Sequence, residues 1–241
     1  MTPKYRAALF DLDDTIFDHQ GHRRDALSAI ARSVAALSGA DVRDLERAHD
    51  IHLQRTHRAV LDGSMSIAEA RVERMRRLLD DFGVRADAAL AERCEEIYRE
   101  AYGRDWRAVA GVTELLRSLR DLGMWLGVIT NGIWSEQSAK LRSLGLETAF
   151  DELMVSEVVG SRKPAREFFS HAVARTGLPA SQCIVVGDLW EIDIQGALDY
   201  GLDSIWLNRY GHTRALHPRV VEVDSFTPTA AVLRFFVDGL P

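Results

Sequence analysis

The chain has 241 residues, 46% of them hydrophobic, and a formal net charge of -6. This length and composition suit one large domain, or a core that carries a smaller insertion, and disfavour a disordered chain. Because no long basic block offsets the negative charge, we expect neither a nucleic acid polymer nor an anionic membrane as a partner. The sequence shows no signal-like N-terminal segment and no run of roughly 18 apolar residues, which predicts a soluble, cytoplasmic protein. Its two cysteines form no CxxC pair, so neither a disulfide framework nor a zinc site is indicated.

The first predicted element is a buried strand in "YRAALF", which runs directly into the acidic stretch "DLDDT" at residues 11–15. Carboxylates are rarely buried without partners, so this crowding calls for a cation at the end of the strand. On a regular strand, Asp11 and Asp13 would share one face of the sheet, because side chains alternate with a period of two. We therefore expect both carboxylates to belong to one site.

The next segment, residues 18–103, lacks strand patterns and is almost wholly helical. Amphipathic periodicity predicts helices near 22–37, 42–61, 66–82 and 87–102. A capping box of Ser66 and Glu69 is predicted to start the third of these helices. Because the block directly follows the first strand, we interpret it as a separate helical cap. Its second helix contains three histidines, for which packing or surface roles are favoured over a metal site: His49, His52 and His57.

From residue 104 onward, helical stretches that close on glycine alternate with short β-rich runs. Glycine tolerates positive φ, which is a common way of ending a helix. The β-rich runs are "MWLGVIT", "FDELMVS", "CIVVGD" and "DSIWLN". With the first strand, they predict a doubly wound, Rossmann-like α/β fold around a five-stranded parallel sheet. The predicted domains are a catalytic core at residues 1–17 and 104–241 and a helical cap at residues 18–103.

Acidic residues also follow the run "CIVVG", where Asp188 and Asp193 lie in "GDLWEID". In open parallel sheets, the carboxyl ends of the strands meet at one edge, and ligands bind there. We therefore expect Asp11, Asp13, Asp188 and Asp193 to converge. Converging carboxylates without matching cations favour a hard divalent cation, and Mg²⁺ suits oxygen ligands combined with a phosphate group.

Two further segments carry candidate phosphate ligands. Thr130, Asn131 and Gly132 end "GVITNG", where a hydroxyl and backbone N–H groups at a helix start can cradle a phosphate. Taken alone, this segment is better explained as an ordinary turn and helix cap. Lys163 stands out because only three of the 30 cationic residues are lysines, and lysine offers a compact charge that can bridge a carboxylate and a phosphate. For Trp134, packing at the start of a helix is favoured over stacking on a nucleobase.

Four segments in this order, "DLDDT", "ITNG", "RKP" and "GDLWEID", resemble the motifs of the haloacid dehalogenase superfamily. With the helical insertion after the first motif, the chain is similar to the phosphatase branch of that superfamily, and it looks most like bacterial housekeeping 5'-nucleotidases. The resemblance implies that Thr130 and Lys163 hold the phosphoryl group of a substrate.

The same resemblance implies roles for the four aspartates. Asp11 would be the nucleophile that forms an aspartyl phosphate, and Asp13 the general acid and base. Mg²⁺ would be bound by Asp11, the backbone carbonyl of Asp13 and Asp188, with Asp193 supporting it directly or through water. One departure is Asp14, at a position where the superfamily often has glycine or a small polar residue, and we expect it to serve a local turn or cap.

The predicted function is therefore Mg²⁺-dependent hydrolysis of a phosphomonoester, acting on a small phosphorylated metabolite. A nucleoside 5'-monophosphate is the leading substrate, with sugar phosphates and phosphoglycolate as alternatives. A 2-haloacid dehalogenase ranks behind, because that reaction has no use for an acid and base at Asp13. A non-catalytic binding protein is the remaining alternative, and the intact set of motif residues argues against it.

Overall fold

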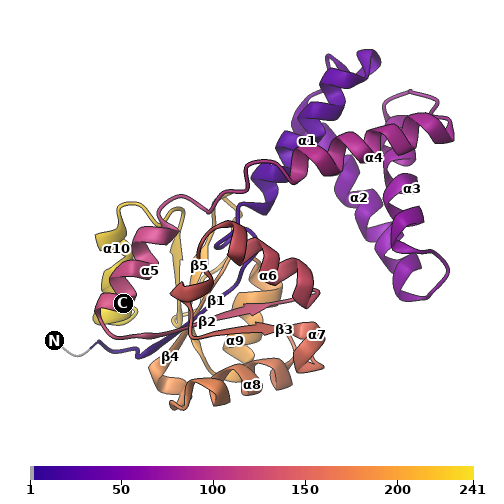
Figure 1. Ribbon diagram of the computed structural model, residues 1–241. Helices are drawn as coiled ribbons and strands as arrows, with labels where there is room; N and C mark the ends of the chain where they lie inside the picture. Colours follow the sequence, from indigo (N-terminus) through magenta and orange to yellow (C-terminus); the bar gives the residue numbers. More distant parts are fainter. Residues whose placement is uncertain (1–2) are drawn as a thin grey trace. The chain divides into compact units, whose positions relative to one another are not determined.

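The computed structural model describes residues 3–241, which form two compact units. The larger unit comprises the residues up to Asp18 together with Trp106–Pro241, and the smaller one comprises His19–Asp105 (Figure 1). The smaller unit is the segment in which the sequence predicts a cap. Its role as a cap stays a prediction.

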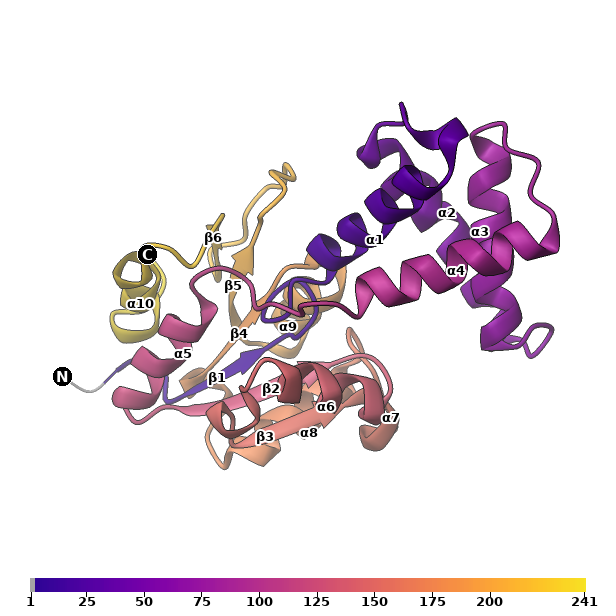
Figure 2. The same ribbon diagram turned by 45° about the horizontal axis from the view of Figure 1, so that its top comes forward.

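The larger unit is built on a single six-stranded parallel sheet with strand order β3-β2-β1-β4-β5-β6, seen from a second direction in Figure 2. The strands are β1 (Ala7–Phe10), β2 (Trp125–Thr130), β3 (Glu152–Val155), β4 (Cys183–Gly187), β5 (Asp203–Leu207) and β6 (Val220–Val223). The order places β1 and β4 side by side at the centre, so the acidic segments that follow them are neighbours. The predicted doubly wound α/β class is confirmed.

Helices cover both faces of this sheet. They are α5 (Val112–Asp121), α6 (Trp134–Ser143), α7 (Ser156–Val159), α8 (Arg166–Thr176), α9 (Gln195–Tyr200) and α10 (Thr229–Val237), with short turns η2 (Glu147–Ala149), η3 (Ala180–Gln182) and η4 (Trp190–Ile194). Successive side chains of β1 point to opposite faces of the sheet, and they show which helices cover each face. Ala7 and Leu9 belong to an apolar cluster with Phe168 of α8, whereas the ring of Phe10 stacks on that of Phe236 of α10 with centroids 6.4 Å apart.

The strand β6 was not predicted, so the expectation of five strands is wrong by one. This edge strand has four residues, "VVEV", of which only Val220 is buried. It pairs with β5 only after a long exposed loop, and such a short run carries little signal against the surrounding loop residues. Its addition extends the sheet at the edge away from β1.

The smaller unit consists of four long helices and one short turn: α1 (His19–Ser33), η1 (Ala35–Leu37), α2 (Val42–Leu61), α3 (Ile67–Asp81) and α4 (Ala88–Tyr102). The predicted capping box is confirmed, because the Ser66 side chain accepts from the backbone of Glu69 and the Glu69 side chain accepts from the backbone of Ser66. Leu27, Met75 and Leu78 are among the residues of an apolar core that joins these helices. Within residues 3–241, none of the helices is both long and apolar enough to span a membrane.

The histidines of α2 take different positions. His49 is fully buried and stacks on Tyr98, with ring centroids 5.1 Å apart, and in the described part of the chain neither ring nitrogen has a hydrogen-bond partner. His52 is also buried, and its Nε2 lies 2.6 Å from a carboxylate oxygen of Asp81. Packing roles therefore hold for these two, and the side chain of His57 lies outside the described residues.

Candidate active site

The centre of the candidate site is a buried lysine between two aspartates. The Nζ atom of Lys163 donates to Oδ1 of Asp11 at 2.5 Å and to Oδ1 of Asp193 at 2.7 Å. The lysine side chain is only 2% exposed, and both carboxylates are also buried. A buried charge needs a partner of opposite sign, and each of these three groups has one. The structure thus brings together residues from three of the four sequence motifs.

The backbone of β1 and the loop before α8 position these groups. The backbone N–H of Asp11 donates to the carbonyl of Val186 on β4 at 2.8 Å, which continues the pairing of β1 and β4 by one residue. The Asn131 side chain holds the backbone of Lys163 through two hydrogen bonds. Its Nδ2 donates to the carbonyl of Lys163 at 3.0 Å, and its Oδ1 accepts from the N–H of Lys163 at 2.9 Å. Asn131, predicted to bind substrate, thereby holds the backbone that presents Lys163.

The second acidic segment is shaped by the π-helical turn η4, which begins at Trp190. Within this turn the Oδ2 atom of Asp193 accepts from the N–H of Leu189 at 3.1 Å, so both carboxylate oxygens of Asp193 are engaged. Gly187 makes this fold possible, since a Cβ atom there would lie 2.5 Å from the Cβ of Asp193. Short π-helical turns are frequent at functional sites.

Asp188 completes a group of carboxylates that can hold a metal ion. Asp11, Asp188 and Asp193 each offer one oxygen, and these three oxygens lie within 4.8 Å of one another. Burial, reinforced by the neighbouring carboxylates, raises the pKa of Asp188 well above its ordinary value. Burial likewise raises the pKa of Asp11 to about 7, although Lys163 acts in the opposite direction.

This donor set fits Mg²⁺. It consists of carboxylate oxygens only, and the single ammonium of Lys163 balances only part of their charge, so a hard divalent cation would relieve the remaining repulsion. Because both oxygens of Asp193 are engaged by protein donors, Asp11 and Asp188 are the carboxylates better placed to bind the ion directly.

Asp13 lies outside this group. The regular strand ends at Phe10, so the period of two does not extend to Asp13, and the expectation of a shared strand face is wrong. Asp14 follows with φ of 64°, and its N–H donates to the carbonyl of Phe17 at 2.7 Å, which forms a tight turn as predicted. Aspartate tolerates this left-handed conformation better than most residues. The side chain of Asp13 contacts α6 rather than Lys163.

Two residues of α6 that the sequence analysis missed bind the carboxylate of Asp13. Lys140 Nζ donates to its two oxygens at 2.6 and 2.8 Å, and Gln137 Nε2 donates to Oδ2 at 3.1 Å. The scarcity of lysine was a signal that could have identified Lys140, since it singles out this residue as much as Lys163.

The other candidate phosphate ligands have protein partners. Thr130 is buried, and its Oγ1 accepts from Gln137 Nε2 at 2.7 Å, so Thr130 and Asp13 are joined through Gln137. The backbone N–H of Gly132 donates to Ser156 Oγ at 3.0 Å. The roles of Thr130 and Gly132 in binding a phosphoryl group stay predictions.

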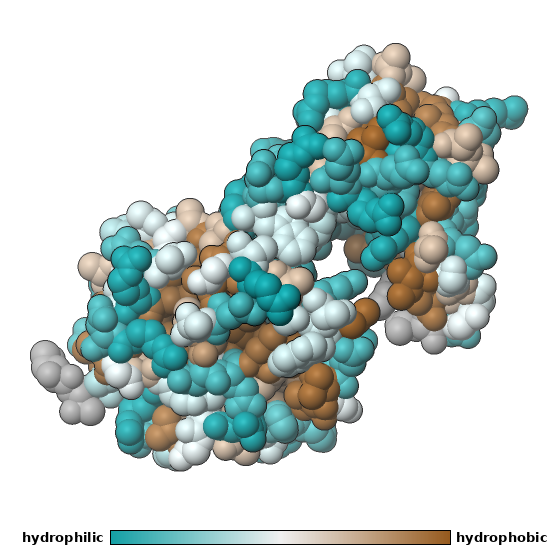
Figure 3. Space-filling model, in the orientation of Figure 1, coloured by the Kyte–Doolittle hydropathy of each residue, from teal (hydrophilic) through white to brown (hydrophobic). Residues whose placement is uncertain are grey.

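Several apolar side chains are exposed beyond the carboxyl ends of β2, β3 and β4: Ile133, Trp134, Val158 and Leu189. Trp134 is 45% exposed at the first position of α6, so the expectation that it packs at the start of the helix is wrong. On the face drawn in Figure 3, hydrophobic patches on both units are interrupted by hydrophilic surface.

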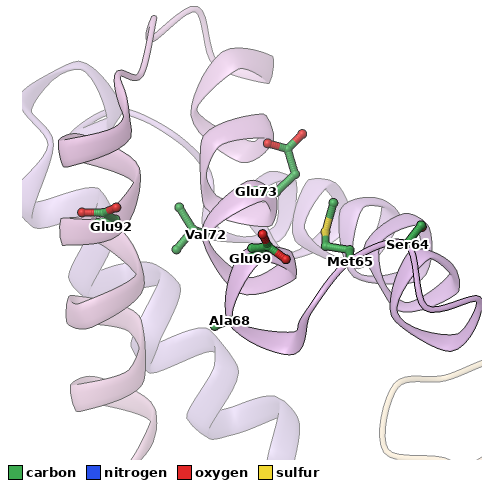
Figure 4. A pocket seen from close by; sticks show the side chains of 7 residues that line it. All are labelled: Ser64, Met65, Ala68, Glu69, Val72, Glu73 and Glu92. Atoms are coloured by element: carbon green, nitrogen blue, oxygen red, sulfur yellow. The ribbon is translucent and has the colours of Figure 1, made fainter.

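A surface depression on the smaller unit lies between α3 and α4, and Figure 4 shows the residues that line it. Two of its three glutamates have structural partners. Glu69 closes the capping box of α3, and Glu73 pairs with Arg76 and Arg77. Helix capping and ion pairing therefore account for these two glutamates, and we assign no chemistry to the depression.

A parallel α/β sheet with a buried lysine and three aspartates, two of them buried, beyond the ends of β1 and β4 defines a hydrolase-type site at the edge where such sheets bind ligands. The family model for haloacid dehalogenase-like hydrolases matches residues 5–201, and the chain belongs to this family. The resemblance of its four motifs is thereby confirmed, and the chain is an enzyme of this hydrolase family.

The chain is similar to several named relatives. It is 31% identical over 206 residues to the HAD-hydrolase YfnB of Bacillus subtilis, covering 85% of each chain. A crystal structure of YfnB bound to magnesium superposes with a TM-score of 0.71 at 29% identity, covering 95% of this chain and 99% of that one. The chain is also 28% identical over 218 residues to the pyrimidine 5'-nucleotidase PynA of Streptococcus pneumoniae, covering 88% of each. A glyceraldehyde 3-phosphate phosphatase of Methanopyrus kandleri is 26% identical over 218 residues, with 89% of this chain and 88% of that protein covered.

Proposed function

We propose that this enzyme is a Mg²⁺-dependent phosphomonoesterase that forms an aspartyl phosphate on Asp11 and acts on a nucleoside 5'-monophosphate. One observation carries the proposal: the ammonium of Lys163 lies between the buried carboxylates of Asp11 and Asp193. A carboxylate nucleophile needs a cation beside it to meet the negative oxygens of a phosphate group, and Lys163 supplies one at 2.5 Å from Asp11.

The reaction would take two steps. An oxygen of Asp11 attacks phosphorus, the bond between phosphorus and the leaving oxygen breaks, and Asp13 donates a proton to that oxygen. A water molecule then attacks the phosphorus of the aspartyl phosphate and gives a proton to Asp13. The bond between phosphorus and Asp11 breaks, which releases inorganic phosphate and restores the free carboxylate.

Lys163 and Asp193 would act together in both steps. The ammonium would neutralise charge on the phosphoryl oxygens, while Asp193 keeps the lysine in place through its 2.7 Å bond. Asp11 and Asp188 would hold Mg²⁺, with Asp193 behind them. When bound, Mg²⁺ would supply the positive charge that stabilises the transferring phosphoryl group. The carboxylate oxygens within 4.8 Å of one another and the magnesium-bound structure of YfnB support this assignment.

The substrate assignment draws on the named relatives. PynA is a pyrimidine 5'-nucleotidase, and the pyrimidine 5'-nucleotidase YjjG of Escherichia coli is 39% identical over 101 residues, which cover 42% of this chain and 44% of that protein. The glyceraldehyde 3-phosphate phosphatases support a sugar-phosphate substrate as the alternative. A solved structure named as a 2-haloacid dehalogenase, with 27% identity and a TM-score of 0.58, makes dehalogenation a reaction to test directly.

The test is release of inorganic phosphate from uridine 5'-monophosphate, glyceraldehyde 3-phosphate and phosphoglycolate, each with Mg²⁺ and with a chelator. We expect Mg²⁺-dependent release that is fastest with the nucleotide. Asp11→Asn should abolish it, whereas Asp224→Asn, a matched change at an exposed aspartate, should leave it unchanged.

The other outcomes discriminate between the alternatives. Faster release from glyceraldehyde 3-phosphate or phosphoglycolate would replace the nucleotide assignment but keep the mechanism. Release of chloride from 2-chloropropionate without release of phosphate from any ester would overturn the phosphatase proposal. Activity that persists in Asp11→Asn would overturn the role of Asp11 as the nucleophile.

A further inference from the structure

The carboxylate of Asp13 is held by a second lysine that belongs to no motif of the site described above. Lys140 Nζ contacts both of its oxygens, at 2.6 and 2.8 Å. The lysine side chain is 10% exposed and that of Asp13 is 30% exposed, so the pair is largely shielded from water. Because both oxygens face the same ammonium, these contacts fix the direction in which the carboxyl group points.

Gln137 adds a third contact and ties the pair to β2. Its Nε2 lies 3.1 Å from Asp13 Oδ2, 2.7 Å from Thr130 Oγ1 and 3.0 Å from the carbonyl oxygen of Asn131. Gln137 and Lys140 are three residues apart on α6, so they lie on the same face of the helix. The Asp13 carboxylate is thus bound to a helix face that is itself anchored at the end of the neighbouring strand.

The surroundings of Lys140 favour a fixed position over the usual mobility of a lysine. Its Nζ lies 5.2 Å from the ring centre of Phe17, the residue whose backbone closes the turn that carries Asp13. The ring and the low exposure keep water away from the ammonium and strengthen its attraction to the carboxylate. In addition, two of the three lysines of the chain contact the two aspartates of "DLD", one lysine for each aspartate.

We propose that Lys140, supported by Gln137, is a positioning residue that fixes the carboxyl group of Asp13 for proton transfer to the leaving oxygen. The expected effect on proton transfer rests on the proposed phosphatase reaction. The expected effect on the orientation of the Asp13 carboxyl group rests only on the contacts of Lys140. Without Lys140, Asp13 keeps its chemical group but loses the orientation that makes proton transfer efficient.

The kinetic test uses Lys140→Met, which keeps the length of the apolar stem and removes the charge. With the nucleotide, whose leaving oxygen needs a proton, we expect kcat to fall about 100-fold and KM to change less than about 3-fold. With 2,4-dinitrophenyl phosphate, whose leaving group departs without a proton, we expect release of dinitrophenolate in the first turnover, before the aspartyl phosphate is hydrolysed, to slow less than about 5-fold. Lys4→Met, at a lysine whose side chain is 45% exposed, should change neither rate. Equal losses in the first turnover of both esters would overturn the proposal.

Restoring the charge provides a second readout. Lys140→Cys followed by reaction with 2-bromoethylamine regenerates an ammonium at nearly the original distance. The two native cysteines are buried and should not react, and the same treatment of the parent protein checks this. Recovery of most of the nucleotide activity supports positioning by Lys140, and failure to recover opposes it. If Lys140→Met does not fold, Gln137→Met carries the same comparison of the two esters with a smaller expected loss, about 10-fold on the nucleotide.

A crystal structure of Lys140→Met separates this inference from the proposed function. We expect the Asp13 carboxyl group to leave its present orientation, whereas an unchanged position would overturn the inference even in an active enzyme. If the parent protein releases phosphate from no ester, the proposed function fails, and the orientation of Asp13 in the variant still decides whether Lys140 positions it.

Discussion

Replacement of Lys163 by methionine is the sharpest test of the electrostatics of the site. Lys163→Met keeps most of the buried volume of the side chain but removes the ammonium that contacts Asp11 at 2.5 Å and Asp193 at 2.7 Å. Both carboxylates are buried, so they would then face each other and Asp188 without a counter-ion. The expected result is a large loss of stability rather than a loss of activity alone.

The magnitude follows from the burial of the pair. Removing one partner of a buried ion pair costs about 3–5 kcal/mol, because the remaining charge is left uncompensated. At about 2–4 °C per kcal/mol for a chain of this size, the midpoint of thermal unfolding should fall by about 6–20 °C. The loss should be larger at pH 8 than at pH 6. Burial already raises the pKa of Asp11 to about 7, and loss of Lys163 removes a cation that lowers it. At pH 6 the Asp11 carboxyl of the folded variant is therefore protonated and uncharged, whereas at pH 8 it must carry an uncompensated charge.

The assay is thermal unfolding followed by circular dichroism in chelator, so that a divalent cation cannot replace the missing charge. Lys4→Met is the matched control, because its side chain is 45% exposed and its removal should cost less than about 0.5 kcal/mol. A Lys163→Met protein that unfolds within about 2 °C of the parent at pH 8 would refute the reasoning, since it would show that the two carboxylates are stable without their cation.

Three further outcomes are expected. Mg²⁺ should raise the unfolding midpoint of the parent protein, by about 2.7 kcal/mol of stability at 100 times its dissociation constant, and Asp188→Ala should abolish this shift in a titration followed by calorimetry. Gly187→Ala should destabilise the protein and lower activity, because the added Cβ would lie 2.5 Å from the Cβ of Asp193, whereas Gly39→Ala meets no atom within 4 Å and should be neutral in urea unfolding. Burial and neighbouring cations lower the pKa of His49 well below 6.5, so the unfolded chain binds a proton that the folded chain does not. Below pH 6.5, His49 should therefore lower the free energy of unfolding by about 1.4 kcal/mol per pH unit. If the free energy of unfolding of the parent and of His49→Phe changed equally with pH in this range, the prediction would be contradicted.

The convergence of Asp11, Lys163, Asp188 and Asp193 could be predicted from the sequence. Asp11 and Asp188 follow buried apolar runs directly, and parallel strands bring such positions to one edge whatever the length of chain between them. Composition identified Lys163, because arginine is the usual cation of this chain. The positions of the aspartates needed only strand ends and residue types, whereas the resemblance to the haloacid dehalogenase motifs placed Lys163 beside them.

The surroundings of Asp13 could not be predicted in the same way. A period of two holds only while the chain is a strand, and β1 ends at Phe10. Beyond it, the left-handed conformation of Asp14 sets the direction of the chain, and "DDT" does not specify that conformation. The contacts of Lys140 and Gln137 depend further on how α6 is rotated against the sheet, which its weak amphipathic pattern does not specify.

The two aspartates of "DLD" thus differ in the environment of their charges, and this difference matches the two tasks of the proposed reaction. Asp11 is buried beside Lys163 and the carboxylates proposed to hold Mg²⁺, an environment that keeps its oxygen beside the cations a phosphate would meet. Asp13 is more exposed and is bound to Lys140 on a separate helix, so a proton that it exchanges with a leaving group or with water does not break the contact between Asp11 and Lys163. If both aspartates shared one lysine, protonation of either would change the electrostatic support of the other. Separate lysines remove this coupling through a common partner, which is a physical reason for the chain to place two of its three lysines here.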